Sequence, residues 1–270
     1  MEFFLYNNQM GFMLDKFQYR SIVLFIFVLC FVNPCYSQNL NQTVYVWEPD
    51  SCTIYTLPAL DSPTIVRLAY GDSILFVQEE ALSTTPLFPL SDSYNQDTLQ
   101  FAKWLKVKLK SKIGYVLENQ VSELKPFQKN QYGFEPLHTF LKREYGLLDS
   151  LNFNRDFLIG KSTFNVPIDS LSFLNKSTFT TAYKDGCKNY KYEFKNISLI
   201  NAYFLLNIDV YYDQVYINWD TDQSEHAIYS LKLEKIEQNT YFFKDLNTQF
   251  GLKIIDLKNG TISLEYYYCM

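Results

Sequence analysis

The distribution of apolar and polar residues predicts a chain built mainly of short strands. Between residues 43 and 124, short apolar runs are separated by turn residues. The clearest run begins at Trp104, after which Leu105, Val107 and Leu109 alternate with lysines. A period of two places alternate side chains on opposite faces of a strand. This run therefore predicts a strand with one face in the core and the other in solvent.

Residues 136–270 predict a second antiparallel β-rich region that begins with one short helix. Pro136 is suited to the start of this helix and Gly146 to its end. Between them, apolar residues have the spacing of one helix face; they are Leu137, Phe140 and Leu141. From residue 157 onward the pattern returns to strands, which we expect to pack as a barrel or a sandwich.

A hairpin is predicted near the C-terminus. Asn259 and Gly260 separate two β-prone runs, and Asn-Gly is a preferred pair for a two-residue type I′ turn. Counting outward from that turn places Ile255 opposite Leu264. One register then satisfies both faces of a half-buried hairpin.

The N-terminal segment predicts export. Lys16 and Arg20 precede an unbroken apolar run at residues 22–32, and a proline and small residues follow. This order is typical of a secretory signal peptide. The run is about half of the ~20 apolar residues that a membrane-spanning helix needs, so we expect no stable membrane span.

Cleavage near Ser37 would remove residues 1–37 and leave Gln38 as the new N-terminus. The mature protein would then be periplasmic, extracellular or exposed at the cell surface. A lipoprotein attached through Cys35 is the alternative. It is less favoured because Asn33 and Pro34 replace the small and aliphatic residues of a lipobox.

Charge and composition narrow the function classes. The formal net charge of −5 is unchanged by loss of the signal peptide, which carries as many acidic as basic residues. A mildly acidic protein is not expected to bind nucleic acid through a basic surface. The apolar content of 47%, with 18% aromatic residues, supplies ample material for packed cores.

Three cysteines remain after cleavage: Cys52, Cys187 and Cys269. A disulfide between Cys187 and Cys269 would tie the last strand to an earlier segment, so we predict this pair and a free Cys52. The spacing of the cysteines fits no zinc site. Gly160 and Lys161 resemble the end of a phosphate-binding loop, but Arg155 stands where its first glycine belongs. We therefore expect no metal and no cofactor.

Four motifs follow one another between residues 43 and 124. The first is a Pro turn at Leu57 and Pro58, and the second is a strand ending at a Gly turn, with Ile65, Val66, Leu68, Gly71 and Asp72. The third is a Trp-centred strand with Trp104 and Val107, and the fourth is a Gly-aromatic-Val strand at Gly114, Tyr115 and Val116. This ordered set resembles the bacterial Src-homology-3-like family. The resemblance implies a small β-barrel of five or six strands.

The expected organisation is therefore a Src-homology-3-like domain at residues 38–126, a linker at 127–135 and a β-rich domain of unassigned family at 136–270. A long inserted loop, at about residues 78–102, splits the barrel. The family's Asn and Arg before the Pro turn are missing here, so the family's ligand does not carry over.

Two groups of residues are candidates for ligand binding. Lys106 and Lys108 follow Trp104 on one strand face, where they could bind an anionic glycan, a lipid headgroup or an acidic peptide. Tyr115 lies in the Gly-aromatic-Val motif, and Trp219 belongs to an aromatic group that could stack on a sugar or peptide ring. The competing interpretations are a solubilising lysine face and an aromatic core cluster.

These observations favour an exported, non-enzymatic binding protein whose Src-homology-3-like module contacts cell-envelope material, such as a peptidoglycan peptide or glycan, or a protein partner. The alternative is an immunity or inhibitor protein that blocks a secreted toxin or enzyme. A third hypothesis is a hydrolase using Cys187 and His226. It is disfavoured because the predicted disulfide competes for the same sulfur. His138, on the expected helix, is interpreted as an exposed polar residue.

Overall fold

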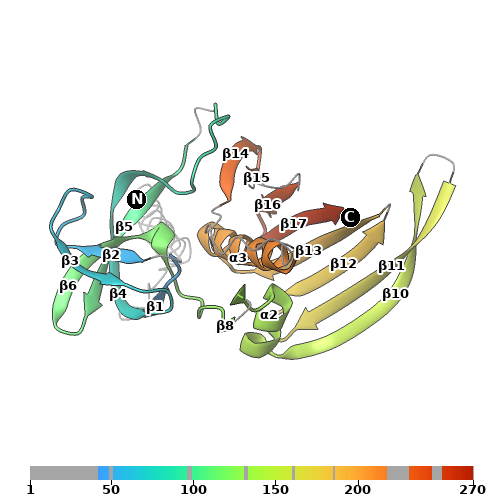
Figure 1. The fold of residues 1–270 in the computed structure, drawn as a ribbon, viewed down its shortest axis with the longest axis horizontal. Helices are drawn as coiled ribbons and strands as arrows, with labels where there is room; N and C mark the ends of the chain where they lie inside the picture. The colour runs from blue at the N-terminus through green and yellow to red at the C-terminus, as the bar shows by residue number, and fades with distance from the viewer. Residues whose placement is uncertain are drawn as a thin grey trace, which may run out of the picture. The chain divides into compact units, whose positions relative to one another are not determined.

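The computed structural model describes residues 42–48, 51–95, 99–130, 133–159, 162–184, 186–217, 231–244 and 251–269. The expected signal peptide with Ser37 and Cys35 lies outside these residues, as do Trp219 and His226. The described chain is mainly β and contains two large antiparallel sheets, which confirms the predicted fold class (Figure 1).

Sheet A is seven-stranded, with the order β3-β2-β6-β5-β4-β1-β7, and it curls into a half-barrel (Figure 1). Its core residues alternate along the strands, as in β5, where Leu105 and Val107 are buried. Val107 lies opposite Gly114 on β6. The elements of sheet A are β1 (Thr43–Val46), β2 (Cys52–Tyr55), β3 (Thr64–Leu68), β4 (Ser73–Pro86), β5 (Phe101–Leu109), β6 (Lys112–Leu117), the 3₁₀ turn η1 (Glu118–Gln120) and β7 (Val121–Ser122).

Gly114 is required by close packing rather than by a turn. A Cβ atom at this position would lie 2.4 Å from Cγ2 of Ile54 and 2.9 Å from the carbonyl oxygen of Tyr55. β2 and β6 meet at this point, where Tyr55 pairs with Tyr115. Only glycine leaves room for the two strands to approach this closely.

The expected inserted loop is partly strand and partly core. β4 continues to Pro86 and β5 begins at Phe101, so the connection is shorter than predicted. Within it, Phe88 is only 2% exposed. Leu233 of sheet B donates its backbone N–H to the carbonyl oxygen of Pro89 at 2.7 Å and accepts from the N–H of Ser91 at 3.0 Å. This connection therefore joins sheet A to sheet B.

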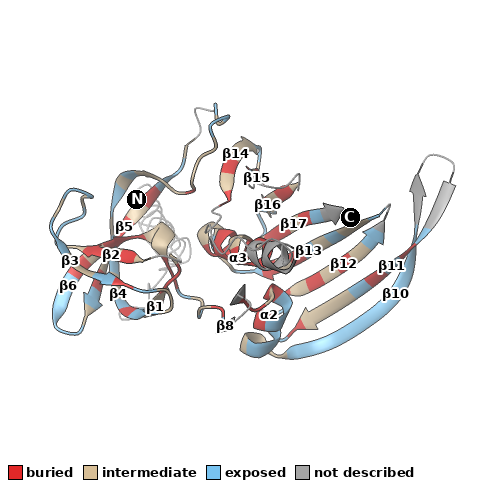
Figure 2. Cartoon of the chain, viewed as in Figure 1, coloured by how far each residue is buried: buried red, intermediate tan, exposed pale blue. Residues whose placement is uncertain are grey.

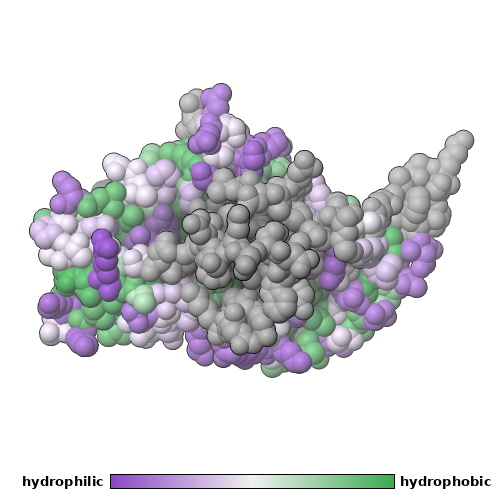
Figure 3. Space-filling view, in the orientation of Figure 1, coloured by the Kyte–Doolittle hydropathy of each residue, from purple (hydrophilic) through white to green (hydrophobic). Residues whose placement is uncertain are grey.

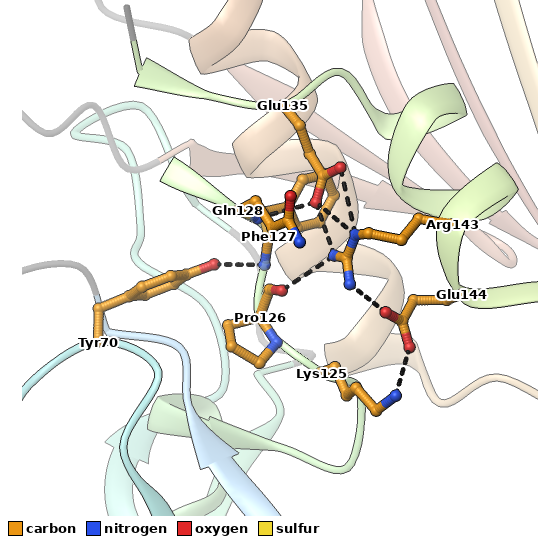
Figure 4. Close-up of polar contacts among 8 residues, drawn as sticks. All are labelled: Tyr70, Lys125, Pro126, Phe127, Gln128, Glu135, Arg143 and Glu144. Atoms are coloured by element: carbon orange, nitrogen blue, oxygen red, sulfur yellow. Dashed lines mark hydrogen bonds and ion pairs between the residues drawn. The ribbon is translucent and has the colours of Figure 1, made fainter. Parts of the chain in front are cut away.

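The segment expected as a linker is also packed against its surroundings (Figure 4). The backbone N–H of Phe127 donates to the hydroxyl oxygen of Tyr70 at 2.9 Å, which ties the segment to the turn after β3. Glu135 at the end of the segment accepts from Nη2 of Arg143 at 2.6 Å. The same network extends to Lys125, Pro126, Gln128 and Glu144.

Sheet B is eight-stranded, with the order β10-β11-β12-β13-β17-β16-β15-β14, and is open rather than a closed barrel or a sandwich. Helix α2 contacts β11, and helix α3 contacts β16 and β17. The elements are the paired strands β8 (Lys129–Asn130) and β9 (Gly133–Phe134), then α2 (Leu137–Tyr145), β10 (Leu147–Ile159), β11 (Ser162–Phe173), β12 (Thr178–Lys184), β13 (Cys187–Lys195), α3 (Leu199–Ile217), β14 (Lys232–Glu237), β15 (Thr240–Lys244), β16 (Leu252–Asp256) and β17 (Thr261–Cys269).

Helix α2 matches the sequence prediction. Pro136 is its N-cap, and Gly146 ends it with a φ of 72°. The predicted apolar stripe faces the core, since Leu137, Phe140 and Leu141 are all buried. The prediction of the short helix is therefore confirmed.

Helix α3 was not predicted; the sequence pattern indicated strands throughout this region. The helix is apolar around most of its circumference, and residues 201–206 and 208–210 are all buried (Figure 2). A helix buried on all sides lacks the 3.6-residue alternation that reveals an amphipathic helix. Among the described residues, no helix is long and apolar enough to cross a membrane.

The C-terminal hairpin forms, but the predicted register is wrong by one residue. Ile254, rather than Ile255, lies opposite Leu264. Because neighbouring residues of a strand face opposite sides, this shift sends Ile254 into the core, where it is fully buried. Leu257 remains exposed.

The cause is a loop one residue longer than the type I′ turn. The backbone N–H of Leu257 donates to the carbonyl oxygen of Thr261 at 3.0 Å, which leaves Lys258, Asn259 and Gly260 in the loop. Lys258 takes a φ of 58° and Gly260 a φ of 74°. The N–H of Lys258 donates to Oδ1 of Asp256 at 2.9 Å. Three-residue loops of this kind are also common in hairpins.

The large aromatic core of sheet B and its helices extends to the end of β1, whereas the strands of sheet A pack in a separate apolar cluster. Trp47, just after β1, is 2% exposed and packs with ring centroids 5.7 Å from Phe127 and 5.3 Å from Phe204 of α3. Its indole N–H donates to the carbonyl oxygen of Leu124 at 2.9 Å. Burying an aromatic ring with its polar atom satisfied stabilises the connection between the two sheets.

Candidate functional site

The sequence-predicted ligand residues of sheet A do not form an open platform. Trp104, Lys106 and Tyr115 lie on one face of the sheet, with Lys106 opposite Tyr115 in the β5–β6 register. The Trp104 ring is only 3% exposed, and it packs edge-on against Tyr55 at 5.7 Å in a small apolar cluster. Lys106 lies 3.9 Å from the carboxylate of Glu80.

Lys108 is exposed on the same strand, two residues beyond Lys106. Trp219, the remaining predicted residue, lies outside the described residues. The structure thus brings part of the predicted set together but packs its main ring into a core.

Sheet B carries a cavity of about 440 Å³ on the face that the helices cover. The strand register builds it, because Asn152 lies opposite Asp169 and Tyr190 opposite Tyr266. Thr181 of β12 lies between these two pairs, so side chains of five neighbouring strands point to the same side. The residues that matter most for its chemistry are Asn152, Asp169, Phe179, Lys188, Tyr190 and Tyr266.

A buried carboxyl group lies in the wall of this pocket. Asp209 of α3 is 4% exposed, and it accepts hydrogen bonds from the hydroxyl of Tyr266 at 2.5 Å and from the backbone N–H of Leu137 at 2.9 Å. The hydroxyl of Tyr192 also hydrogen-bonds to it. Burial raises the pKa of Asp209 above its usual value, and these hydrogen bonds oppose the rise only in part.

Asp209 also holds helix α2 and strand β17 in place at the wall of the pocket. Leu137 is the first residue of α2, and Pro136 before it has no side chain that can accept a hydrogen bond, so Asp209 serves as the cap of that helix end. Through Tyr266 the same carboxyl group holds β17. The sequence analysis missed Asp209 because it assigned strands to the segment that forms α3.

Stacked aromatic rings line the pocket. The rings of Tyr190 and Tyr266 stack at 4.6 Å, and those of Phe179 and Tyr192 at 4.4 Å. His138 of α2 is exposed, as expected, but its ring also stacks on Phe179 at 5.6 Å. Although the residue as a whole is exposed, the shielding of its imidazole from solvent and the charge of the nearby Lys188 lower the pKa of His138.

Polar groups surround these rings. Nδ2 of Asn152 donates to Oδ1 of Asp169 at 2.7 Å, which leaves other lone pairs and an N–H for a ligand. Nζ of Lys188 lies 4.9 Å from the centre of the Tyr190 ring. The pocket thus offers aromatic rings, an amide, a carboxylate and a cation within one concave site, as ligand sites commonly do.

The structure describes the backbone positions of the two cysteines in the predicted disulfide. Cys187 and Cys269 lie opposite each other in the β13–β17 register, but the side chain of Cys269 is outside the described atoms. The disulfide therefore stays a prediction. Cys52 is a free, buried thiol near Oε1 of Gln120, and burial raises its pKa to about 12.

Comparison with known proteins gives no further assignment. No protein-family model, curated protein or solved structure matches this chain. The resemblance to the bacterial Src-homology-3-like family stays a prediction. Within the described part of the chain, no three His, Cys, Asp or Glu residues gather closely enough to hold a metal ion.

Proposed function

We propose that the protein is an exported, non-enzymatic binding protein that holds a saccharide-containing fragment of the cell envelope in the sheet B pocket. The observation that carries this proposal is the pocket itself, in which stacked aromatic rings and a paired amide and carboxylate face the same concave space. The N-terminal signal pattern supports a ligand outside the cytoplasm.

The chemistry of the pocket fits a saccharide of this kind. Sugar rings have apolar C–H faces that pack on aromatic side chains such as Tyr190, and their hydroxyls both donate and accept hydrogen bonds. The Asn152–Asp169 pair supplies both functions. Lys188 adds a cation suited to a carboxylate of the ligand. Peptidoglycan fragments combine sugar hydroxyls, acetamido groups and carboxylates, so they use all of these groups.

Isothermal titration calorimetry with soluble disaccharide-peptides from digested peptidoglycan tests the proposal. We expect the protein to bind these fragments and Asn152→Ala to weaken the affinity by roughly tenfold, the equivalent of one hydrogen bond of about 1.4 kcal/mol. Asn165→Ala is the matched control. Asn165 makes the same kind of bond, to Asp156 at 2.8 Å on the same hairpin, but does not line the pocket.

A second matched pair tests the role of the cation. Lys188→Ala is expected to weaken binding, whereas Lys235→Ala should leave it unchanged. Lys235 also lies over a ring, 4.5 Å from the centre of Phe242, but outside the pocket. Absence of binding by the unmodified protein, or equal losses in both members of each pair, would contradict the proposal.

A further inference from the structure

Strand β10 is a long edge of sheet B. It runs for 13 residues, pairs with β11 on one side, and has no strand on its other side among the described residues. An edge strand presents a row of backbone N–H and C=O groups that another strand can pair with. β10 is more than twice the length of a typical strand, which is about five or six residues.

Several of the usual protections against pairing are missing from this edge, although it carries three charged residues, Asp149, Arg155 and Asp156. β10 contains no proline and no lysine, and its irregularity lies at its start, between Leu147 and Asp149. Large apolar side chains are exposed along it, with Leu151 at 54% and Phe153 at 44%. Figure 3 shows hydrophobic surface among hydrophilic residues along this edge.

In the described part of the sheet, the end of β10 farthest from β12 has few strand neighbours. β12 pairs only with Ile168–Ser172 of β11. The more distant parts of β10 and β11 therefore pair only with each other in the described residues. A two-stranded ribbon is marginally stable alone. A further strand paired with β10 would therefore stabilise the part of this ribbon that lies next to the rest of the sheet.

The sequence of β10 is complementary to itself in one antiparallel register. A twofold axis through Asn152 places Asp149 opposite the partner's Arg155 and Leu151 opposite the partner's Phe153. These residues share one face of the strand, because they alternate with Ser150, Asn152 and Asn154. Shifting the register by two residues either way removes both Asp–Arg pairs.

We propose that β10 is a homodimer interface, in which two copies of this chain join their sheets edge to edge through antiparallel β10 strands centred on Asn152. The contact is isologous, as in most twofold dimers. It buries the exposed apolar side chains of both copies beside each other and adds an ion pair at each end. The twofold axis is perpendicular to the sheet, so both pockets open on the same face.

Charge reversal tests this register. In Asp149→Arg, two arginines face each other at each end of the interface, and in Arg155→Asp two aspartates do. We expect each single variant to raise the dimer dissociation constant roughly tenfold or more. A one-to-one mixture of the two single variants restores both ion pairs in a heterodimer, and the double variant restores them in a homodimer.

Sedimentation velocity over a concentration series provides the readout, and circular dichroism confirms that each variant is folded. Leu151→Lys is expected to weaken the dimer, whereas Leu57→Lys, at a residue 59% exposed in the turn after β2, is the control. The proposal is overturned if the unmodified protein sediments as a monomer at high micromolar concentration. It is equally overturned if mixing the single variants fails to restore the dimer.

Discussion

Replacing Asp209 by alanine is expected to lower the free energy of unfolding by about 3–5 kcal/mol. The buried side chain accepts hydrogen bonds from the hydroxyls of Tyr266 and Tyr192 and from the backbone N–H of Leu137. Alanine leaves these three donors buried without a partner, at a cost of about 1–3 kcal/mol each. The lost helix cap and the small cavity add to this, while the removal of a poorly solvated carboxyl group offsets part of it.

The pH dependence follows from the raised pKa of Asp209. The folded protein holds this proton more tightly than the unfolded chain, whose pKa is near the usual 3.8. The stabilisation is fully present below that pH and is lost as the pH rises through the folded-state pKa. Asp209→Asn carries no such proton, so its stability relative to the unmodified protein should increase as the pH rises.

Urea unfolding monitored by intrinsic fluorescence measures these differences, at several pH values and with unchanged m-values as the check on two-state behaviour. Asp156→Ala, at an exposed carboxylate that also accepts a hydrogen bond, is the control and should change stability by less than about 0.5 kcal/mol. The reasoning is refuted if Asp209→Ala falls within 1 kcal/mol of the unmodified protein, or if the Asp209→Asn difference has the opposite pH slope.

Two further predictions concern sheet A and the cysteines. Gly114→Ala should destabilise the protein by about 1–3 kcal/mol in thermal or urea unfolding, because the added Cβ meets Ile54 and the backbone of Tyr55. A change of less than about 0.5 kcal/mol would contradict the packing argument. In the mature protein, thiol titration should find no reactive group in the native state at pH 8, because burial raises the pKa of Cys52 to about 12. After denaturation without reductant a single thiol should react, whereas three would disprove the predicted disulfide between Cys187 and Cys269.

The sequence predicted those parts of the fold in which one face of an element is buried. The alternation around Val107 located β5, and the spacing of Leu137, Phe140 and Leu141 located α2. Helix α3 escaped prediction because it is apolar around most of its circumference. The C-terminal register was missed because the loop geometry at Lys258 and Gly260, rather than the Asn-Gly pair alone, decides the pairing.

The candidate site was less predictable than the fold. The sequence analysis chose Trp104, Lys106 and Lys108 as ligand residues because they are close together along the chain, yet the indole of Trp104 is buried. The pocket residues come from several separate elements and share a face only through the strand register. The pairing of Asn152 with Asp169, and of Asp209 with Tyr266, requires knowledge of which strands and helices meet.

The most direct test of the central claim is NMR of protein with ¹³C-labelled tyrosine rings, titrated with disaccharide-peptides from peptidoglycan. Tyr190 and Tyr266 face the sheet B pocket, whereas Tyr55 and Tyr115 belong to the apolar cluster around Trp104 on sheet A. We predict saturable shifts of the Tyr190 and Tyr266 resonances with little change at Tyr55 and Tyr115. Shifts confined to the two sheet A tyrosines, or no shifts at any of the four, would contradict the assignment of the ligand site to sheet B.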